Sequence, residues 1–189
     1  MKFKGESFVT ADLHLGHHGV CKFLTNEGTK LRPWETIEEM DEALVNNWNK
    51  TVTRNDKVYV LGDVVINRRA LVTIGRLNGS KVLVKGNHDI FRLDEYTKYF
   101  YDIRAYHIIH NMVLSHIPIH EESQARFDGN IHGHLHSNRV LKDGKIDPWY
   151  LCVSVEHTNF KPMPLMEAIK TLKEQEGYKV KERTSGGVG

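Results

Sequence analysis

Cysteine and long apolar runs are both scarce in this sequence. The two cysteines among its 189 residues, Cys21 and Cys152, lie far apart and do not form a metal-binding pair, so we expect the ordinary reduced thiols of a cytosolic protein. No apolar run approaches the roughly 20 residues that a membrane helix needs, and the N-terminal segment lacks the apolar centre of a signal peptide. The sequence therefore predicts a cytoplasmic protein with no membrane partner.

Neither sign of charge dominates the chain, whose formal net charge is +2. Nothing in this balance requires a nucleic-acid partner, and the basic pair Arg68-Arg69 is too short to indicate one. Internal repeats and low-complexity linkers are also absent from the sequence. A chain of this length can bury a large core without disulfides or structural metals. We expect a single domain over residues 1–183 and a flexible tail over residues 184–189; the sequence sets no oligomeric state.

Short apolar runs rich in β-branched residues alternate with helical patterns. The runs predict strands over residues 7–11, 57–61, 81–85, 112–115 and 150–155. Helices are predicted from a capping box at Thr36 and Glu39, over residues 69–77, and after Pro164. Strands that alternate with helices favour a layered α/β architecture.

Histidine is the residue type in surplus, with 12 copies, and several of these follow the predicted strands together with acidic or amide residues. The residues at these strand ends are Asp12, His14, Asp63, Asn87, His88, Asp89, His116, His134 and His136. Ligands of α/β proteins usually bind at the carboxyl ends of the strands. In extended backbone, side chains two residues apart point to the same side, so Asp12 and His14 should converge, as should His134 and His136.

The ligand types at these strand ends suit a pair of divalent metal ions. Imidazole and carboxylate without thiolate favour Mn, Fe, Zn, Ni or Co, and a carboxylate such as Asp63 can bridge two ions. Two ions about 3.5–4 Å apart can clamp both oxygens of an in-line phosphoryl displacement. Such a centre carries about one net positive charge, which attracts a phosphoester anion without separating monoesters from diesters.

The order of these motifs resembles the signature of the calcineurin-like metallophosphoesterase superfamily. The motifs are Asp12-x-His14, Gly62-Asp63, Gly86-Asn87-His88-Asp89, His116, and Gly133-His134-x-His136. The opening Asp12-Leu13-His14-Leu15-Gly16-His17 and the segment 153–156 resemble a small prokaryotic and phage subgroup. The resemblance implies a four-layer αββα sandwich of two mixed β-sheets flanked by helices, with two divalent transition-metal ions, manganese first among them.

The resemblance also implies roles for individual residues. One metal would be held by Asp12, His14, Asp63 and His136, and the other by Asp63 as a bridge with Asn87, His116 and His134. His88 would act as a catalytic residue that stabilises the transition state or protonates the leaving oxygen. Asp89 is grouped with His88 among the candidate catalytic residues, either to orient His88 or to cap a turn.

Some of these residues have alternatives. His17 and Arg32 are candidates for binding the substrate phosphate, because arginine offers planar charged donors, but both could belong to a solvated loop. Taken singly, the strand-end Asp and Asn residues could simply form turns. His120 lies close enough in sequence to replace His116 as a ligand, although His116 directly ends the apolar run.

The resemblance implies a hydrolase in which a metal-bridging hydroxide attacks a phosphoester in line. By family analogy, the expected substrate is a small phosphodiester, such as a nucleotide or cyclic nucleotide. The alternatives on the same site are a phosphomonoesterase and a nuclease. A non-catalytic metal-binding scaffold is a further alternative, and its relatives would typically lack ligands or the assisting histidine, which are all present here. The last alternative is a module that binds a single metal ion.

Overall fold

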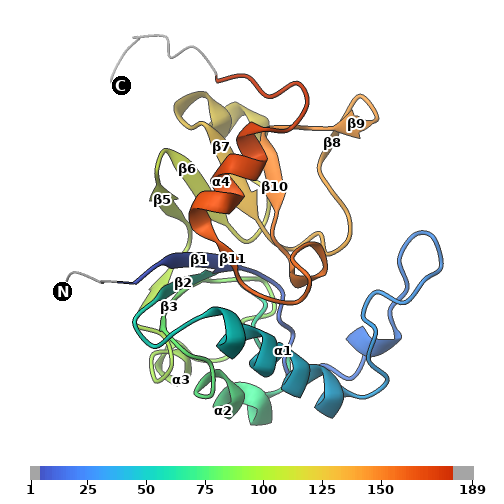
Figure 1. Cartoon of the computed structure of the whole chain (residues 1–189), viewed down its shortest axis with the longest axis vertical. Helices are drawn as coiled ribbons and strands as arrows, with labels where there is room; N and C mark the ends of the chain where they lie inside the picture. The colour runs from blue at the N-terminus through green and yellow to red at the C-terminus, as the bar shows by residue number, and fades with distance from the viewer. Residues whose placement is uncertain (1–4, 181–189) are drawn as a thin grey trace.

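The computed structural model describes residues 5–180 and contains two mixed β-sheets with helices around them (Figure 1). The first sheet has the order β11-β1-β2-β3-β4, with β11 antiparallel to β1 and the others parallel. Its strands are β1 (Ser7–Thr10), β2 (Lys57–Val60), β3 (Ser80–Val84), β4 (Asp102–Arg104) and β11 (Met163–Pro164). The predicted domain end at residue 183 and the predicted tail over 184–189 lie outside the described residues.

The second sheet has the order β10-β7-β6-β5, with β5 antiparallel to β6 and the others parallel. Its strands are β5 (His107–Ile109), β6 (Met112–Ser115), β7 (Gly129–His132) and β10 (Tyr150–Cys152). A separate two-stranded hairpin consists of β8 (Leu141–Lys142) and β9 (Lys145–Ile146).

The helices differ widely in length. The α-helices are α1 (Ile37–Thr51), α2 (Leu71–Ile74), α3 (Leu93–Tyr96) and α4 (Leu165–Lys173), and the 3₁₀ helices are η1 (Val20–Lys22), η2 (Arg68–Ala70), η3 (Glu121–Arg126) and η4 (Val155–His157). The predicted capping box is confirmed at the start of α1, where Thr36 and Glu39 satisfy each other's backbone N–H groups. Within residues 5–180, no helix has the length and apolar character needed to cross a membrane.

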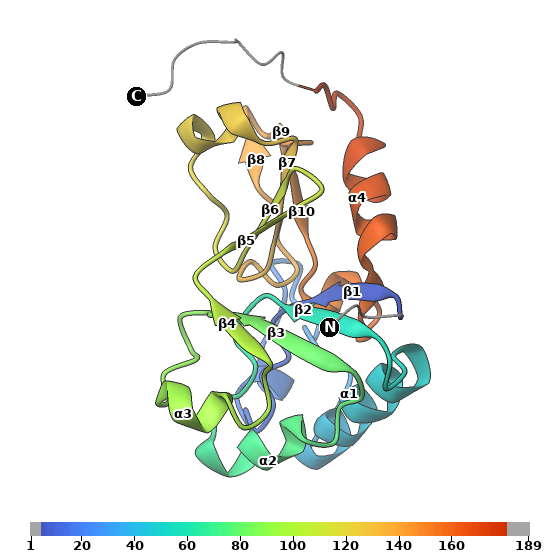
Figure 2. The same ribbon diagram turned by 90° about the vertical axis from the view of Figure 1, so that its left-hand side faces the viewer.

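Two hydrophobic cores separate the layers. One core lies between the first sheet and α1 to α3, and includes Trp48 of α1 and Ile74 of α2. The other lies between the two sheets. It contains Val9 of β1 and Leu61, which directly follows β2, together with Leu114 of β6 in the second sheet. Helix α4 packs against β1 and β11 of one sheet and β7 and β10 of the other, and so closes this second core along one edge (Figure 2).

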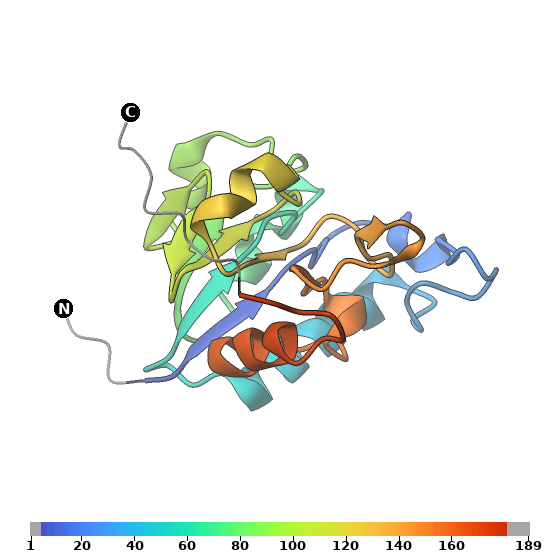
Figure 3. The ribbon, with the colours of Figure 1, turned by 90° about the horizontal axis from the view of Figure 1, so that it is seen from above.

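The prediction of an α/β protein with two mixed sheets flanked by helices is confirmed. The short η3 packs against the second sheet, where Gln124 donates a hydrogen bond to the hydroxyl of Tyr150 in β10. The second helical layer of the expected sandwich is therefore small on this sheet. Seen from above, α4 runs beside β1, on the opposite side of the molecule from η3 (Figure 3).

Most predicted strands match the structure to within a residue or two at each end, but two predicted elements end early. The helix over residues 69–77 is divided into η2 and the single turn of α2, which stops at Gly75. The strand over residues 150–155 ends at Cys152 because η4 begins three residues later, at Val155. The sequence pattern does not predict strand β7, since the polar side chains of Asn130 and His132 interrupt its apolar pattern.

Candidate metal centre

The predicted ligands from all five strand ends meet at one place in the structure. Two groups of side chains each bring three ligand atoms within 4.8 Å of one another. The first group is Asp12, His14 and His136, and the second is Asp63, His116 and His134. The amide oxygen of Asn87 joins the second group, at 2.8 Å from Nε2 of His116. Apart from Asp63, which the resemblance assigns to both metals, each of these side chains lies with the set to which the resemblance assigns it.

Asp63 lies between the two groups. Its Oδ2 atom is 3.7 Å from Nε2 of His14 and 3.4 Å from Nε2 of His116, one histidine from each group. Its Oδ1 atom accepts a hydrogen bond from the backbone N–H of His88 at 2.9 Å. One oxygen is thus held by the backbone while the other faces both groups, which is the arrangement that a bridging carboxylate requires.

Two of the histidines are held through one ring nitrogen and leave the other for the centre. His116 Nδ1 is 2.8 Å from the backbone oxygen of Leu61, and His136 Nδ1 is 3.2 Å from the Glu156 carboxylate. Metal-binding histidines commonly donate their second N–H in this way, which sets the ring orientation. His120 takes no part, because its ring accepts a hydrogen bond from the backbone of Glu122 at the start of η3. This placement favours His116 over His120.

Several buried polar atoms of the first group have no hydrogen-bond partner among the described residues. They are Oδ1 of Asp12 and both ring nitrogens of His14. The other carboxylate oxygen of Asp12 accepts hydrogen bonds from the Ser154 hydroxyl at 2.6 Å and from the backbone N–H of His134 at 2.9 Å. Buried polar atoms without partners are costly, so a cation here would satisfy them. The donor set therefore fits a divalent metal ion.

The backbone brings the ligands together by a different route from the one predicted. Positive φ angles occur at five of the seven predicted ligands: Asp12, His14, Asp63, His134 and His136. The expectation that extended backbone would align each pair two residues apart is therefore wrong. Non-glycine residues rarely adopt this left-handed conformation, and where they do the strain is often held at a functional site. Here the chain turns sharply after β1, β2 and β7, and these turns bring the ligand atoms close together.

Burial and neighbouring charges set the protonation states of the ligands. Burial lowers the pKa of His14 to about 2, with help from the charge of Arg32, so its imidazole is neutral. Burial raises the pKa of Asp12 to about 6, although the neighbouring His116 opposes the shift, so the group is mainly ionised at pH 7. Burial would also raise the pKa of Asp63, but hydrogen bonding and charge from His116 lower it overall. Neutral imidazoles and ionised carboxylates are the metal-binding forms.

The two residues predicted as catalytic have different environments. His88 is exposed, and its ring lies 5.7 Å from that of His14, at the open side of the centre. Asp89 is fully buried, and its carboxylate accepts hydrogen bonds from the backbone N–H groups of Asp63, Val64 and Gly86. Asp89 therefore joins the turns after β2 and β3, which corresponds to the turn-capping alternative and not to a group that reaches the substrate.

The two predicted substrate-binding residues, His17 and Arg32, also differ in burial and in contacts. The Arg32 side chain is fully buried, and its guanidinium donates to the backbone oxygens of Asp12 and Leu13 and to the Glu156 carboxylate. All of its donor nitrogens are directed at protein groups, so the predicted phosphate contact of Arg32 is wrong. His17 lies beside the first ligand group, with its ring 5.6 Å from that of His14.

Two residues with a supporting role were missed. Ser154 and Glu156 hold Asp12 and His136, respectively, through their side chains. Both belong to the segment 153–156 that resembles small prokaryotic relatives, but nothing in the sequence said which ligand each would touch. Their position follows from the parallel pairing of β10 with β7, which places the end of β10 beside Gly133 and the ligands after it.

Relatives of the chain occur in archaea and in a phage. The chain is 33% identical over 176 residues to the uncharacterized protein MJ1445 of Methanocaldococcus jannaschii, across 87% of this chain and 90% of that protein. The chain belongs to the MJ1445 family. Gene 66 protein of Mycobacterium phage L5 is 27% identical over 171 residues, which cover 71% of this chain and 79% of the phage protein.

A solved structure shares the fold of this MJ1445 family member. The Aquifex aeolicus protein AQ665, described as a protein of unknown function, aligns with a TM-score of 0.63 and 24% identity. The alignment covers 87% of this chain and 98% of AQ665. No family model matches the chain. These similarities establish the family and the fold.

Proposed function

We propose that this MJ1445 family member is a binuclear-metal phosphoesterase with the αββα fold of the calcineurin-like metallophosphoesterase superfamily. The observation that carries the proposal is the position of Asp63, whose Oδ2 atom faces one histidine of each ligand group at 3.4 and 3.7 Å. A carboxylate so placed can be shared by two ions. The order of the ligands along the chain supports the assignment to the superfamily.

The residues around each group support two metal sites rather than one. Asp12, His14 and His136 would hold one ion, and Asn87, His116 and His134 the other, with Asp63 shared. The mixed imidazole and carboxylate donors suit manganese or another first-row ion such as Fe, Zn, Ni or Co. When bound, two such ions supply positive charge that attracts a phosphoester anion and acidifies a water molecule.

The exposed His88 side chain is the group best placed to act on the substrate. Its backbone N–H is bound to Asp63, so the residue is tied to the centre, while its ring stays accessible to solvent beside His14. From there the imidazole can donate a hydrogen bond or a proton to the leaving oxygen of a phosphoester. A phosphodiester of a small nucleotide is the substrate that we propose, with a monoester or a nucleic acid as alternatives for the same site.

The experiment that tests this function combines metal content with turnover. Protein loaded with Mn²⁺ is expected to hold two ions per chain by elemental analysis. It should hydrolyse at least one of bis-p-nitrophenyl phosphate, p-nitrophenyl phosphate, cyclic nucleotides and single-stranded DNA. Asp63→Asn weakens the bridge and should reduce both the metal content and the rate. One ion per chain, or two ions without turnover of any substrate, would contradict the proposal.

A further inference from the structure

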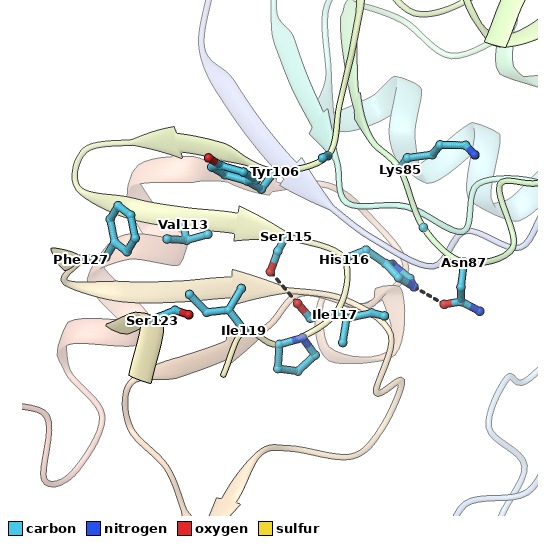
Figure 4. A pocket seen from close by; sticks show the side chains of 13 residues that line it. Lys85, Asn87, Tyr106, Val113, Ser115, His116, Ile117, Ile119, Ser123 and Phe127 are labelled. Carbon is cyan, nitrogen blue, oxygen red and sulfur yellow. Dashed lines mark hydrogen bonds between the residues drawn. The ribbon is translucent and has the colours of Figure 1, made fainter. Parts of the chain in front are cut away.

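A cavity of about 720 Å³ opens directly beside the second ligand group. Two of its lining residues, Asn87 and His116, belong to that group, and Gly86 precedes them in the lining. From this end the cavity extends along β6 toward Phe127, as the side chains in Figure 4 show. Its volume lies within the range of about 300–1,000 Å³ that is usual for small-molecule sites. A molecule held at the metal centre would therefore have room for one substituent here.

The walls of the cavity are largely apolar. Tyr106 and Phe127 contribute aromatic rings, and Val113, Ile117 and Ile119 contribute aliphatic side chains (Figure 4). Tyr106 is 58% exposed and Ile117 is 53% exposed, although both are large hydrophobic residues. Exposed apolar surface that lines a cavity next to polar side chains such as Asn87 and His116 is typical of a ligand-binding site.

Several polar groups in the part of the cavity around Ser115 and Ile119 have partners inside the protein. The Ser115 hydroxyl donates to the backbone oxygen of Ile117, and the Asn130 amide donates to that hydroxyl. The backbone N–H of Ile119 donates to Asn130, and its oxygen accepts from the Tyr150 hydroxyl. Around Ser115 and Ile119 the cavity therefore offers contact area rather than free hydrogen-bonding groups, which favours a flat aromatic ligand over a sugar or a peptide. Lys85 and Ser123 are further polar side chains that line the cavity beyond this part.

We propose that this cavity binds a planar aromatic substituent of the phosphoester, either an aryl group or a nucleobase, while the phosphoryl group sits at the ligand groups. The inference rests on the proposed function, because the cavity is assigned to the substrate of that same centre. Burying a ring against Tyr106, Ile117 and Phe127 removes apolar surface from water. Recognition by contact area predicts a clear preference for aromatic over small aliphatic esters.

Binding of phosphonates tests this preference without requiring turnover. The Mn-loaded protein is titrated in a calorimeter with phenylphosphonate, methylphosphonate and the 5′-phosphonate analogue of thymidine monophosphate. Phenylphosphonate is expected to bind at least tenfold more tightly than methylphosphonate, because the burial of an aromatic ring contributes at least the roughly 1.4 kcal/mol that a tenfold change in affinity requires. Tighter binding of the thymidine phosphonate than of phenylphosphonate would identify a nucleobase as the occupant, and equal or weaker binding an aryl ring.

Variants then assign the preference to the cavity. Ile117→Ser and Tyr106→Ser should each reduce the phenyl-over-methyl ratio at least threefold and leave methylphosphonate binding unchanged. Ile146→Ser is the matched control, because Ile146 is 50% exposed in β9 and does not line this cavity. Equal binding of both phosphonates by the wild type, or a ratio unaffected by both variants, would overturn the inference alone. Failure to bind either phosphonate would overturn the proposed function as well.

Discussion

Arg32 and Glu156 form a buried ion pair directly behind the first ligand group, although 124 positions separate them in sequence. Nε and Nη2 of Arg32 both lie 2.9 Å from Oε1 of Glu156, and that same oxygen is 3.2 Å from Nδ1 of His136. The remaining guanidinium donors hold the backbone oxygens of Asp12 and Leu13. One arginine therefore connects two ligand-bearing loops, which explains why it is buried.

Replacing Glu156 should weaken the first metal site. Glu156→Gln keeps the shape of the side chain but removes the charge that orients His136, and the loss of such a supporting carboxylate typically lowers metal affinity about 10–100-fold. Titration with Mn²⁺ should show one weakened site and one unchanged site. Glu42→Gln is the control, since Glu42 pairs with Arg76 on the surface. Two sites of wild-type affinity in Glu156→Gln would contradict the positioning role.

The same carboxylate should make the metal-free protein sensitive to acid. Burial would raise the pKa of Glu156, but the hydrogen bond to His136 and the charge of Arg32 lower it to about 2, from an ordinary value of 4.5. Because the folded pKa is the lower one, the stabilisation is fully present above pH 4.5 and is lost as the pH falls toward 2. Urea unfolding between pH 6 and 3 should show a shallower loss of stability in Glu156→Gln than in the wild type. Parallel curves would argue against this coupling.

Arg32→Lys distinguishes a structural arginine from a substrate-binding one. A lysine keeps the charge but cannot reach Glu156, Asp12 and Leu13 together, so at least one buried acceptor loses its donor. We expect the free energy of unfolding to fall by at least about 2 kcal/mol in urea titrations. KM for a hydrolysed ester should stay near the wild-type value in the variant that remains folded. A raised KM with unchanged stability would instead support a contact between Arg32 and the substrate phosphate.

His88→Ala should separate catalysis from metal binding. The His88 ring is exposed beside the centre and belongs to neither ligand group, so both ions should remain bound. The loss of an acid–base group typically lowers kcat about 100- to 10,000-fold. Elemental analysis and steady-state kinetics on the same sample test this expectation, with the exposed His18→Ala as the control. Full activity in His88→Ala would remove His88 from the reaction.

Gly62→Ala should destabilise the centre more than a glycine substitution elsewhere. Gly62 has a φ of +81°, and an added Cβ would lie 2.6 Å from the Gly86 backbone and from Nδ1 of His116. Gly144 has a similar φ of +75° but nothing within 4 Å of its Cβ position, so Gly144→Ala measures the backbone strain alone, about 1 kcal/mol. We expect Gly62→Ala to lose at least about 2 kcal/mol more in urea unfolding. Equal losses would show that this region relaxes freely.

Local patterns in the sequence determined the elements and the identity of the ligands. The runs that became β2, β3 and β6 are apolar because each is buried on both faces, and a buried strand can be recognised without its partners. The capping box at Thr36 is equally local, since both of its hydrogen bonds lie within four residues. The motif after each strand is equally local, and its residue types indicate candidate metal ligands.

Only the tertiary structure decided what the supporting residues do. Asp89, Arg32 and Glu156 each contact a group between 26 and 124 positions away in sequence, and no short pattern encodes which group a buried charge will contact. The positive φ angles at Asp12 and His14 are likewise held by the surrounding fold rather than by local preference. The sequence by itself thus determined the strands and the ligand types, because these depend on neighbours along the chain. The long-range contacts determined the ligand geometry, the supporting charges and the cavity, because these depend on neighbours in space.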